Sequence, residues 1–312
     1  MAAPTIVIGT DFSEGSRRAV QAISFLARGA PARLRLVHSF PPGKPKLSGA
    51  ELRRVKSAIA RAETKEAAKL STLAERLRRH GFLVETVAVE GKAAQTLLSQ
   101  ARRVKAGLIA VGTSGRRGVG AVFLGSVAQA VLRDSPVPVM VLPGRNRKGS
   151  RRAGPVLAAI DFDGTAPAVL AAAAGLASDL GVKVHAFHAL RIPFIGPGFP
   201  DAGAAFTPDL LAEDEEAAAV ELTKLVEPFR RHVDVATSCG IGDAPTHLLA
   251  LAQHLGASAI VVGRRKTGRR LGSASSALVQ AADRPVVVIP AGFKPAKGGG
   301  SMQTLGFGPS GP

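Results

Sequence analysis

The stretch Thr5-Ile-Val-Ile-Gly-Thr-Asp11-Phe12 near the start of the chain returns at residues 156–162 as Val-Leu-Ala-Ala-Ile-Asp161-Phe162. The two aspartates lie 150 positions apart, and landmarks further along the chain keep nearly the same offset. A near-constant offset over many landmarks indicates a tandem duplication. The chain of 312 residues is therefore expected to fold as two domains of similar architecture.

Each half alternates short β-branched runs with amphipathic stretches. The pattern of the first half predicts strands near 5–10, 33–39, 82–89, 107–112 and 137–142, and helices near 14–29, 49–80, 92–105 and 125–134. Such alternation predicts an α/β fold with a parallel sheet and right-handed crossovers. In the second half, Glu213-Asp-Glu-Glu216 is expected to open a helix, because acidic side chains stabilise the positive end of the helix dipole.

The net charge of +18 is concentrated in one half of the chain. Residues 1–150 carry 26 basic and 9 acidic side chains, a net charge of +17, and the remaining residues carry only +1. A basic half favours an anionic partner, which could be a nucleotide, a nucleic acid or an acidic surface. The chain has no Trp and no Tyr, so few side chains could stack on single-stranded bases. The nucleic-acid interpretation is weakened by this but stays open.

Composition also disfavours several protein classes. The longest apolar run is too short to span a bilayer, so a membrane-spanning protein is not expected. The first residues lead directly into a predicted strand without a basic leader segment, and a cytoplasmic protein is therefore predicted. Cys239 is the single cysteine, which excludes an internal disulfide and a multi-cysteine zinc site.

A glycine-rich loop follows the fourth predicted strand. Residues 112–126 read Gly-Thr-Ser-Gly-Arg-Arg-Gly-Val-Gly-Ala-Val-Phe-Leu-Gly-Ser. Gly112 ends the strand, and Gly125 and Ser126 begin a helix whose free N–H groups and dipole attract phosphate. Asp11 ends the first strand and should lie in the same crevice, where a carboxylate suits a ribose or a base amino group.

The alternative interpretation is a loop that only turns the chain and caps a helix. The strand before it, the helix after it and the aspartate after the first strand together favour nucleotide binding. The chain has no G-x-x-x-x-G-K-[ST] motif, so it is not a P-loop NTPase. No G-x-G-x-x-G follows the first strand, which disfavours a standard dinucleotide-binding fold.

These residues resemble a known family. Gly112-x2-Gly115-x9-Gly125-Ser126 matches the G-2x-G-9x-G-[S/T] ATP motif of the universal stress protein family, and Ile8-Gly-Thr-Asp11-Phe-Ser and Pro136-Val-Pro-Val-Met-Val-Leu-Pro143 are similar to the same family. The resemblance covers about residues 3–143 and 154–291. It implies two tandem Rossmann-like, doubly wound parallel sheets with strand order 3-2-1-4-5. It also implies that the halves pack as an internal pseudo-dimer through 137–142 and 286–290, with further pairing of chains left open.

The resemblance and the composition together divide the chain into four parts. Residues 1–144 are expected to form a domain with an intact ATP motif, and residues 154–291 a domain with a degenerate one. The basic segment 145–153 is expected to be a linker, and residues 292–312 a flexible tail.

The resemblance implies an adenine-nucleotide site in the first domain. Asp11 would face the adenine or ribose, the backbone at Ser39 would meet the adenine edge, and the helix start would hold the phosphates. A cation such as Mg²⁺ would be held mainly by the phosphates, and neither catalytic residues nor protein metal ligands are expected. The implied binding residues are Thr10, Asp11, Ser39, Gly91, Gly112, Thr113, Gly115, Arg116, Gly125, Ser126 and Val127.

The second half departs from this motif. Lys266 stands where the second motif glycine should be, and the nine-residue spacer is cut to five before Gly272 and Ser273. A degenerate site is therefore predicted there. The basic residues of 264–270 could still attract an anion, but a solvated basic turn is the preferred interpretation.

Three functions remain as hypotheses, in order of preference. The first is a stress-response regulator that binds ATP in its first domain and signals to an unknown protein partner. The second is a slow ATPase or phosphoryl-transfer protein, which would need a positioned base that the loop does not show, since Thr113 and Ser114 are weak candidates. The third is a nucleic-acid-binding protein. His38 and His188 occupy equivalent repeat positions and are expected to be structural.

Overall fold

The structure is a computed structural model, which describes residues 5–26, 32–40, 49–113, 124–143, 154–190, 208–264 and 272–294. The chain divides into two compact units between Arg145 and Asn146, inside the segment predicted to be a linker. The predicted linker, and the predicted tail beyond Lys294, lie outside the described residues.

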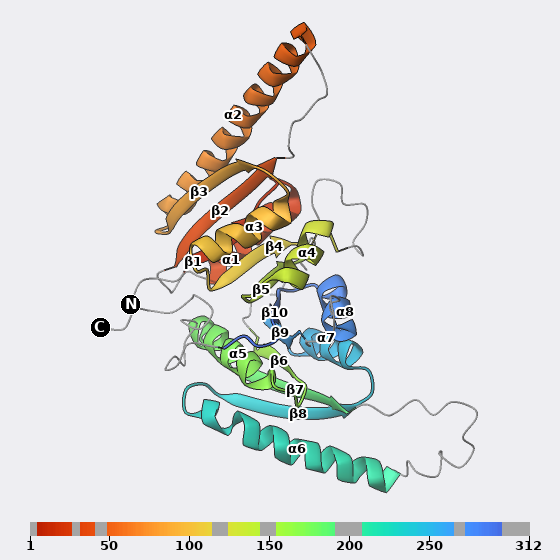
Figure 1. The fold of residues 1–312 in the computed structure, drawn as a ribbon. Helices are drawn as coiled ribbons and strands as arrows, with labels where there is room; N and C mark the ends of the chain where they lie inside the picture. Colours follow the sequence, from red (N-terminus) through yellow and green to blue (C-terminus); the bar gives the residue numbers. More distant parts are fainter. Residues whose placement is uncertain are drawn as a thin grey trace, which may run out of the picture. The chain divides into compact units, whose positions relative to one another are not determined.

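The first unit follows the predicted alternation of strands and helices (Figure 1). Its elements are β1 (Thr5–Gly9), α1 (Glu14–Leu26), β2 (Arg33–Phe40), α2 (Gly49–Arg79), β3 (Leu83–Glu90), α3 (Ala93–Arg103), β4 (Leu108–Gly112), α4 (Ser126–Asp134) and β5 (Val139–Leu142). The strand order β3-β2-β1-β4-β5 confirms the predicted order 3-2-1-4-5.

The second unit repeats this plan element by element. Its elements are β6 (Val156–Ile160), α5 (Ala166–Leu180), β7 (Val184–Leu190), α6 (Pro208–Arg230), β8 (Val235–Ile241), α7 (Ala244–His254), β9 (Ala259–Gly263), α8 (Ser273–Ala281) and β10 (Val286–Ile289). The order β10-β9-β6-β7-β8 is the order of the first unit read from the other end. The duplication inferred from the sequence is therefore a duplication of the fold.

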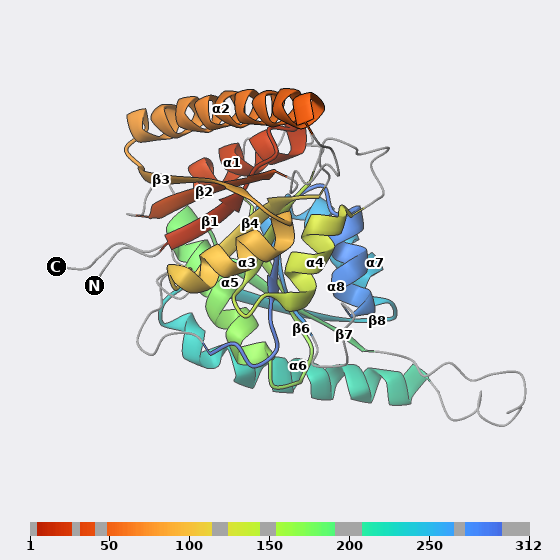
Figure 2. The same cartoon turned by 45° about the horizontal axis from the view of Figure 1, so that its top comes forward.

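The strands pair in parallel, and the first strand of each unit lies at the centre of its sheet. In the first unit Ile8 pairs with Leu36 on one side and Ala110 on the other. Right-handed crossovers that leave the central strand in opposite directions place helices on opposite faces. Accordingly α3 packs beside α4 in the first unit, and α1 and α2 lie on the other face of the sheet (Figure 2).

The central strands are buried on both faces, which is why they read as continuous apolar runs. Ile6, Val7 and Ile8 of β1 have no exposed surface, and Val156, Leu157 and Ala158 of β6 are equally buried. The carboxyl ends of these strands are the places to look for a ligand, since ligands of doubly wound sheets bind there.

Two sequence predictions of element positions were wrong. The acidic run Glu213–Glu216 does not open a helix, because α6 begins earlier at Pro208, a residue that suits the first helical turn. The fifth strand was predicted from residue 137 but begins at Val139. The hydroxyl of Ser135 donates to the Val137 carbonyl, and Pro136 and Pro138 lack the N–H that a strand ladder needs.

The predicted pairing of the two halves as an internal pseudo-dimer stays a prediction. Among the helices that the structure describes, none has the length and apolarity needed to cross a bilayer.

Candidate functional site

Those predicted site residues of the first unit that the structure describes lie at the carboxyl ends of its strands. The backbone N–H of Gly125 donates to the carbonyl of Thr113 at 2.6 Å, which ties the start of α4 to the residue after β4. β1, which ends just before Thr10 and Asp11, is the neighbour of β4 in the sheet. Ser126 and Val127, in the first turn of α4, therefore lie at the same end of the sheet as Asp11.

The turn after β1 is held by its own polar groups. The hydroxyl of Thr10 donates to that of Ser16, and Thr10 is only 6% exposed. The carboxylate of Asp11 accepts the N–H of Ser13 at 3.0 Å, and the hydroxyl of Ser13 in turn accepts the N–H of Ser16. Phe12 has a φ of 60°, a left-handed conformation that bulky residues rarely adopt. The turn thus presents Asp11 in a conformation fixed by local bonds.

His38 is structural, as predicted. Its Nδ1 atom lies 2.8 Å from the carbonyl oxygen of Thr10, and its ring is packed against that of Phe12. The repeat counterpart His188 makes the same bond to Ile160 at 2.9 Å and stacks on Phe162. Both imidazoles hold the turn that carries an aspartate, so each acts by positioning the strand ends.

The other predicted residues of the first unit either lie at strand ends or fall outside the described residues. Ser39 lies near the end of β2, and Gly91 follows β3, where its N–H donates to the carbonyl of Phe40. Gly112 ends β4 and packs so closely on the neighbouring turn that a Cβ added to it would lie 3.0 Å from the carbonyl carbon of Gly15. Gly115 and Arg116 lie outside the described residues.

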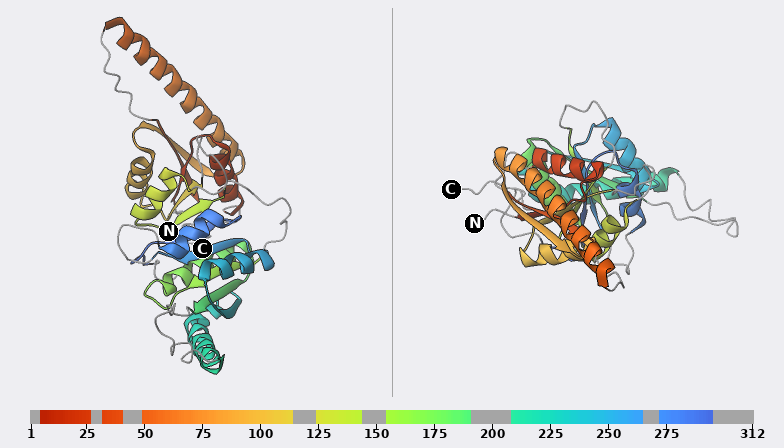
Figure 3. Two further views of the ribbon diagram at one scale, coloured as in Figure 1. Left: turned by 90° about the vertical axis from the view of Figure 1, so that its right-hand side faces the viewer. Right: turned by 90° about the horizontal axis from the view of Figure 1, so that it is seen from above.

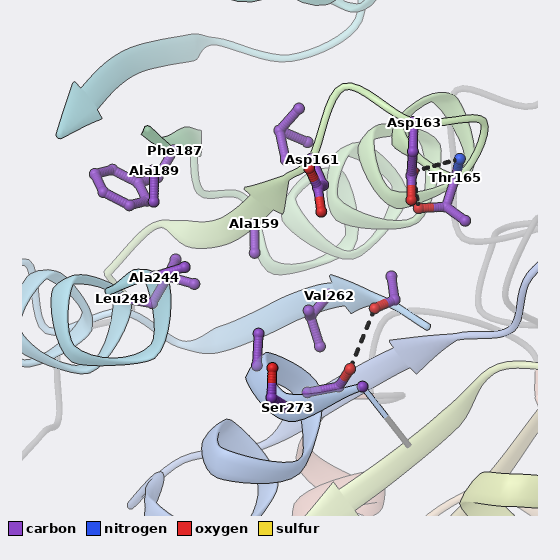
Figure 4. A pocket seen from close by; sticks show the side chains of 15 residues that line it. Ala159, Asp161, Asp163, Thr165, Phe187, Ala189, Ala244, Leu248, Val262 and Ser273 are labelled. Carbon is purple, nitrogen blue, oxygen red and sulfur yellow. Dashed lines mark hydrogen bonds between the residues drawn. The ribbon is translucent and has the colours of Figure 1, made fainter. Parts of the chain in front are cut away.

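The second unit has a cavity at the equivalent place (Figure 4). Its volume is about 190 Å³. Six residues that line it are the repeat counterparts of residues predicted for the first-half site: Asp161, Ala189, Gly263, Gly272, Ser273 and Ala274. They follow Asp11, Ser39, Gly112, Gly125, Ser126 and Val127 by 147 to 151 positions. The constellation predicted from the first-half sequence is thus brought together around one cavity in the second unit.

Hydrogen bonds shape the walls of this cavity (Figure 4). Asp163 accepts bonds from the N–H and the hydroxyl of Thr165, at 2.8 and 2.6 Å, and so fixes the turn that leads into α5. The hydroxyl of Ser275 donates to the carbonyl of Gly263 at 3.3 Å, which joins α8 to the end of β9. Asp161 and Asp163 are two carboxylates on one cavity, where the first unit has Asp11 and Ser13.

Sequence reasoning missed Asp163, Thr165 and Ser275 as cavity residues. The repeat alignment pairs Asp163 with Ser13 at the offset of 150, but Ser13 was not among the predicted site residues, so no signal in the sequence indicated it. Cys239 is half-buried on β8 and does not line the cavity. Burial, and to a lesser degree the charge of Glu215, raise the pKa of its thiol, which disfavours a reactive thiolate at this position.

The geometry agrees with comparisons to known proteins. The model of the universal stress protein family matches residues 3–143 and again residues 153–290. The chain belongs to the universal stress protein family. It is a tandem member, because the family domain occurs twice. A universal stress protein of Mycobacterium tuberculosis is 30% identical over 310 residues, which cover 91% of this chain and 94% of the relative.

A shorter relative and a solved structure are also similar to this chain. A universal stress protein of Thermus aquaticus is 34% identical over 143 residues, which are 44% of this chain and 97% of that protein. The crystal structure of a universal stress protein from Archaeoglobus fulgidus superposes with a TM-score of 0.65 over 94% of this chain and 100% of its own, at 20% identity. At that identity the superposition supports the fold alone.

Proposed function

We propose that the chain binds ATP, or a closely related adenine nucleotide, in its first unit, and acts as a regulatory binding module. The observation that carries this proposal is the bond from the Gly125 N–H to the Thr113 carbonyl, which sets the start of α4 at the carboxyl end of β4. No side chain caps α4, because its N-cap residue is a glycine. The first-turn N–H groups of a helix without such a cap are suited to phosphate oxygens.

The residues around this helix start suit the other parts of a nucleotide. Asp11, which follows the neighbouring strand β1, would accept bonds from the ribose hydroxyls or the adenine amino group. The backbone at Ser39 would meet the adenine edge, and Arg116 would add positive charge near the phosphates. No group of three or more His, Cys, Asp or Glu side chains that could hold a metal occurs among the described residues. A divalent cation would accordingly be bound mainly by the phosphates.

The second unit is proposed not to bind ATP in the same way. Asp163 adds a negative charge where the first unit has the neutral Ser13, and repulsion between this carboxylate and a triphosphate lowers affinity. The loop after Gly263 is also four residues shorter than its counterpart, although residues 265–271 lie outside the part of the chain that the structure describes. One nucleotide per chain is therefore expected.

A matched pair of serine variants tests the proposal. Ser126→Ala should weaken binding of ATP with Mg²⁺ about tenfold or more, since it removes a hydroxyl donor to a charged phosphate. Ser273→Ala is the control in the second unit and should leave affinity and stoichiometry unchanged. Titration calorimetry measures both quantities. If Ser273→Ala lowered ATP affinity and Ser126→Ala did not, the site would lie in the second unit and the proposal would be contradicted.

A second experiment separates this proposal from its rivals. The freshly purified protein is denatured, and any released nucleotide is identified by chromatography and mass spectrometry. About one ATP per chain is expected. ADP in its place would favour a slow ATPase, whereas binding of duplex DNA with a steep dependence on salt, without bound nucleotide, would favour the nucleic-acid hypothesis.

A further inference from the structure

The longest helices of the two units are repeat counterparts with opposite charges. α2 and α6 both connect the second strand of their unit to the third. α2 carries nine basic and four acidic residues, a net charge of +5. α6 carries seven acidic and two basic residues, a net charge of −5. The two units therefore share one fold, but their longest helices carry net charges of opposite sign.

The basic side chains of α2 that the structure describes are exposed to solvent. The side of α2 that packs against the first unit consists of Leu70, Ala74 and Leu77, each at most 3% exposed. The opposite side carries a row at helical spacing, which we call the basic stripe and define as Arg61, Lys65, Arg76 and Arg79. All four side chains are exposed, and none of them forms an ion pair within the described part of the chain. Figure 1 and Figure 3 show that α2 reaches well beyond the end of β3.

α6 has the complementary arrangement. Ala218, Leu222 and Val226 form its buried side, at most 7% exposed. Lys224 is exposed on the outward side, and Arg230 forms an ion pair with Glu227. The same side carries Glu213, Glu216 and Glu227, all exposed, with Val220 between them. We call these four residues the acidic stripe. Val220 is 49% exposed and is one of three large hydrophobic residues exposed among the described residues.

We propose that the basic stripe of one chain docks on the acidic stripe of a second copy of the same chain. The two stripes have similar lengths, since Arg61 to Arg79 spans about 27 Å of helix and Glu213 to Glu227 about 21 Å. Small exposed side chains, Ala68 and Thr72, occupy the middle of the basic stripe and would receive Val220. Charged residues then surround a small apolar contact, as in specific protein interfaces.

A nucleic acid would also be attracted to the basic stripe, but it leaves the acidic stripe and Val220 without a role. The second copy accounts for both faces with one contact. Because the two faces differ, the contact is heterologous, and a closed dimer requires two such contacts related by a two-fold axis. The contact is made of exposed charges, so it should be weakened strongly by salt.

The test uses charge reversal on each helix of the full-length chain. One variant carries Arg61→Glu, Lys65→Glu and Arg76→Glu, and the other carries Glu213→Lys, Glu216→Lys and Glu227→Lys. Sedimentation velocity over a range of protein concentrations at low and high salt measures self-association. Each variant alone should self-associate at least about tenfold more weakly than the parent chain at low salt. An equimolar mixture of the two variants should associate again, because the reversed, acidic α2 of one variant can dock on the reversed, basic α6 of the other.

A control variant changes the net charge by the same amount elsewhere. Lys92, Arg102 and Lys105 are exposed residues in and next to α3, and their change to Glu should leave self-association intact. Circular dichroism confirms that each variant is folded. The proposal is overturned if the parent chain is monomeric at all concentrations, if association survives both reversals, or if the mixture fails to associate. A monomer that loses duplex-DNA binding on reversal of α2 would instead assign the basic stripe to nucleic acid.

Discussion

The two units solve the same packing problem with different residues. In the first unit, Gly112 at the end of β4 faces the backbone of Gly15, and the turn after β1 is capped by Ser13. In the second unit, Gly263 at the end of β9 faces the side chain of Thr165, and in the equivalent turn Asp163 accepts the N–H of Thr165. Both strand ends keep a glycine, so the two units share the requirement for a residue without a Cβ at this position. The side chains that would set ligand chemistry diverged.

The largest expected effects concern the buried sides of α2 and α6. Leu70→Ala and Leu222→Ala should each lower the free energy of unfolding by about 2–5 kcal/mol, because both side chains are at most 1% exposed and a cavity would remain. Urea denaturation measures the change. Leu83→Ala, at a residue that is 62% exposed, is the control and should change stability by less than about 0.5 kcal/mol. Equal effects at all three positions would contradict the assigned buried sides.

The glycines after β4 and β9 should respond differently to the same substitution. Gly263→Ala places a Cβ in collision with Oγ1 of Thr165 and should destabilise the second unit by about 1–3 kcal/mol. Thr165→Gly, which reproduces the glycine of the first unit, should recover most of this loss. Gly112→Ala meets backbone atoms, for which no side-chain deletion can compensate. Thermal unfolding of the single and double variants checks this, and a double variant no more stable than Gly263→Ala would refute the comparison.

Ser13 after β1 and its counterpart Asp163 after β6 should set ligand preference at the proposed nucleotide site. Ser13→Asp should weaken ATP binding to the first unit about tenfold, because it adds a carboxylate near the phosphates. Asp163→Ser is the reciprocal change and should raise the affinity of the second unit for nucleotide. Aspartate and serine both accept a backbone N–H in these turns, so stability should change little. If calorimetric titrations showed the same nucleotide affinity in the parent chain and in both variants, these two residues would have no part in ligand binding.

The smallest expected effect is a pH dependence confined to the second unit. Burial raises the pKa of Asp179 in α5 to about 7, and its Oδ2 atom is buried without a hydrogen-bond partner within the described part of the chain. The folded state then binds the proton more tightly than the unfolded state. The stabilisation from protonated Asp179 is present at acidic pH and is lost as the pH rises toward and through about 7.

Asp179→Asn isolates this contribution. The variant should be more stable than the parent chain at pH 8 by about 1 kcal/mol, a value reduced for the partial exposure of the side chain, and the difference should shrink toward pH 5. Denaturant titrations across this range measure it. Asp214→Asn, at an exposed residue of α6, is the control and should show no such trend. A difference that grows toward acidic pH would have the wrong sign.

Much of the fold could be predicted from the sequence because its signals are local. The apolar runs of β1, β4 and their repeats, and the amphipathic periods of α3 and α4, place those elements to within a few residues. The start of α6 was missed because the acidic run was assumed to mark a first turn. A helix dipole stabilises acids in its first turn but does not require them to be there, and Pro208 was the better signal.

The candidate site was predictable only in part. The family motif indicated Asp11, Gly112, Gly125 and Ser126, and the second-unit cavity shows that their counterparts share one space. Asp163 and Thr165 were not predicted, because their place on the cavity follows from how the turn after β6 folds back on itself. The roles of Gly115 and Arg116 stay predictions, since they lie outside the described residues.

The sequence by itself determined the duplication, the family and the identity of the strands, because repeat offset, motif spacing and hydrophobic period can all be read along the chain. The tertiary structure decided which residues meet. Parallel strands are joined through crossovers, so Asp161 reaches Gly263 and Ser273 only when the sheet is assembled. The tertiary structure also decided which sides of α2 and α6 face solvent, because the side that a helix buries depends on the sheet that it covers.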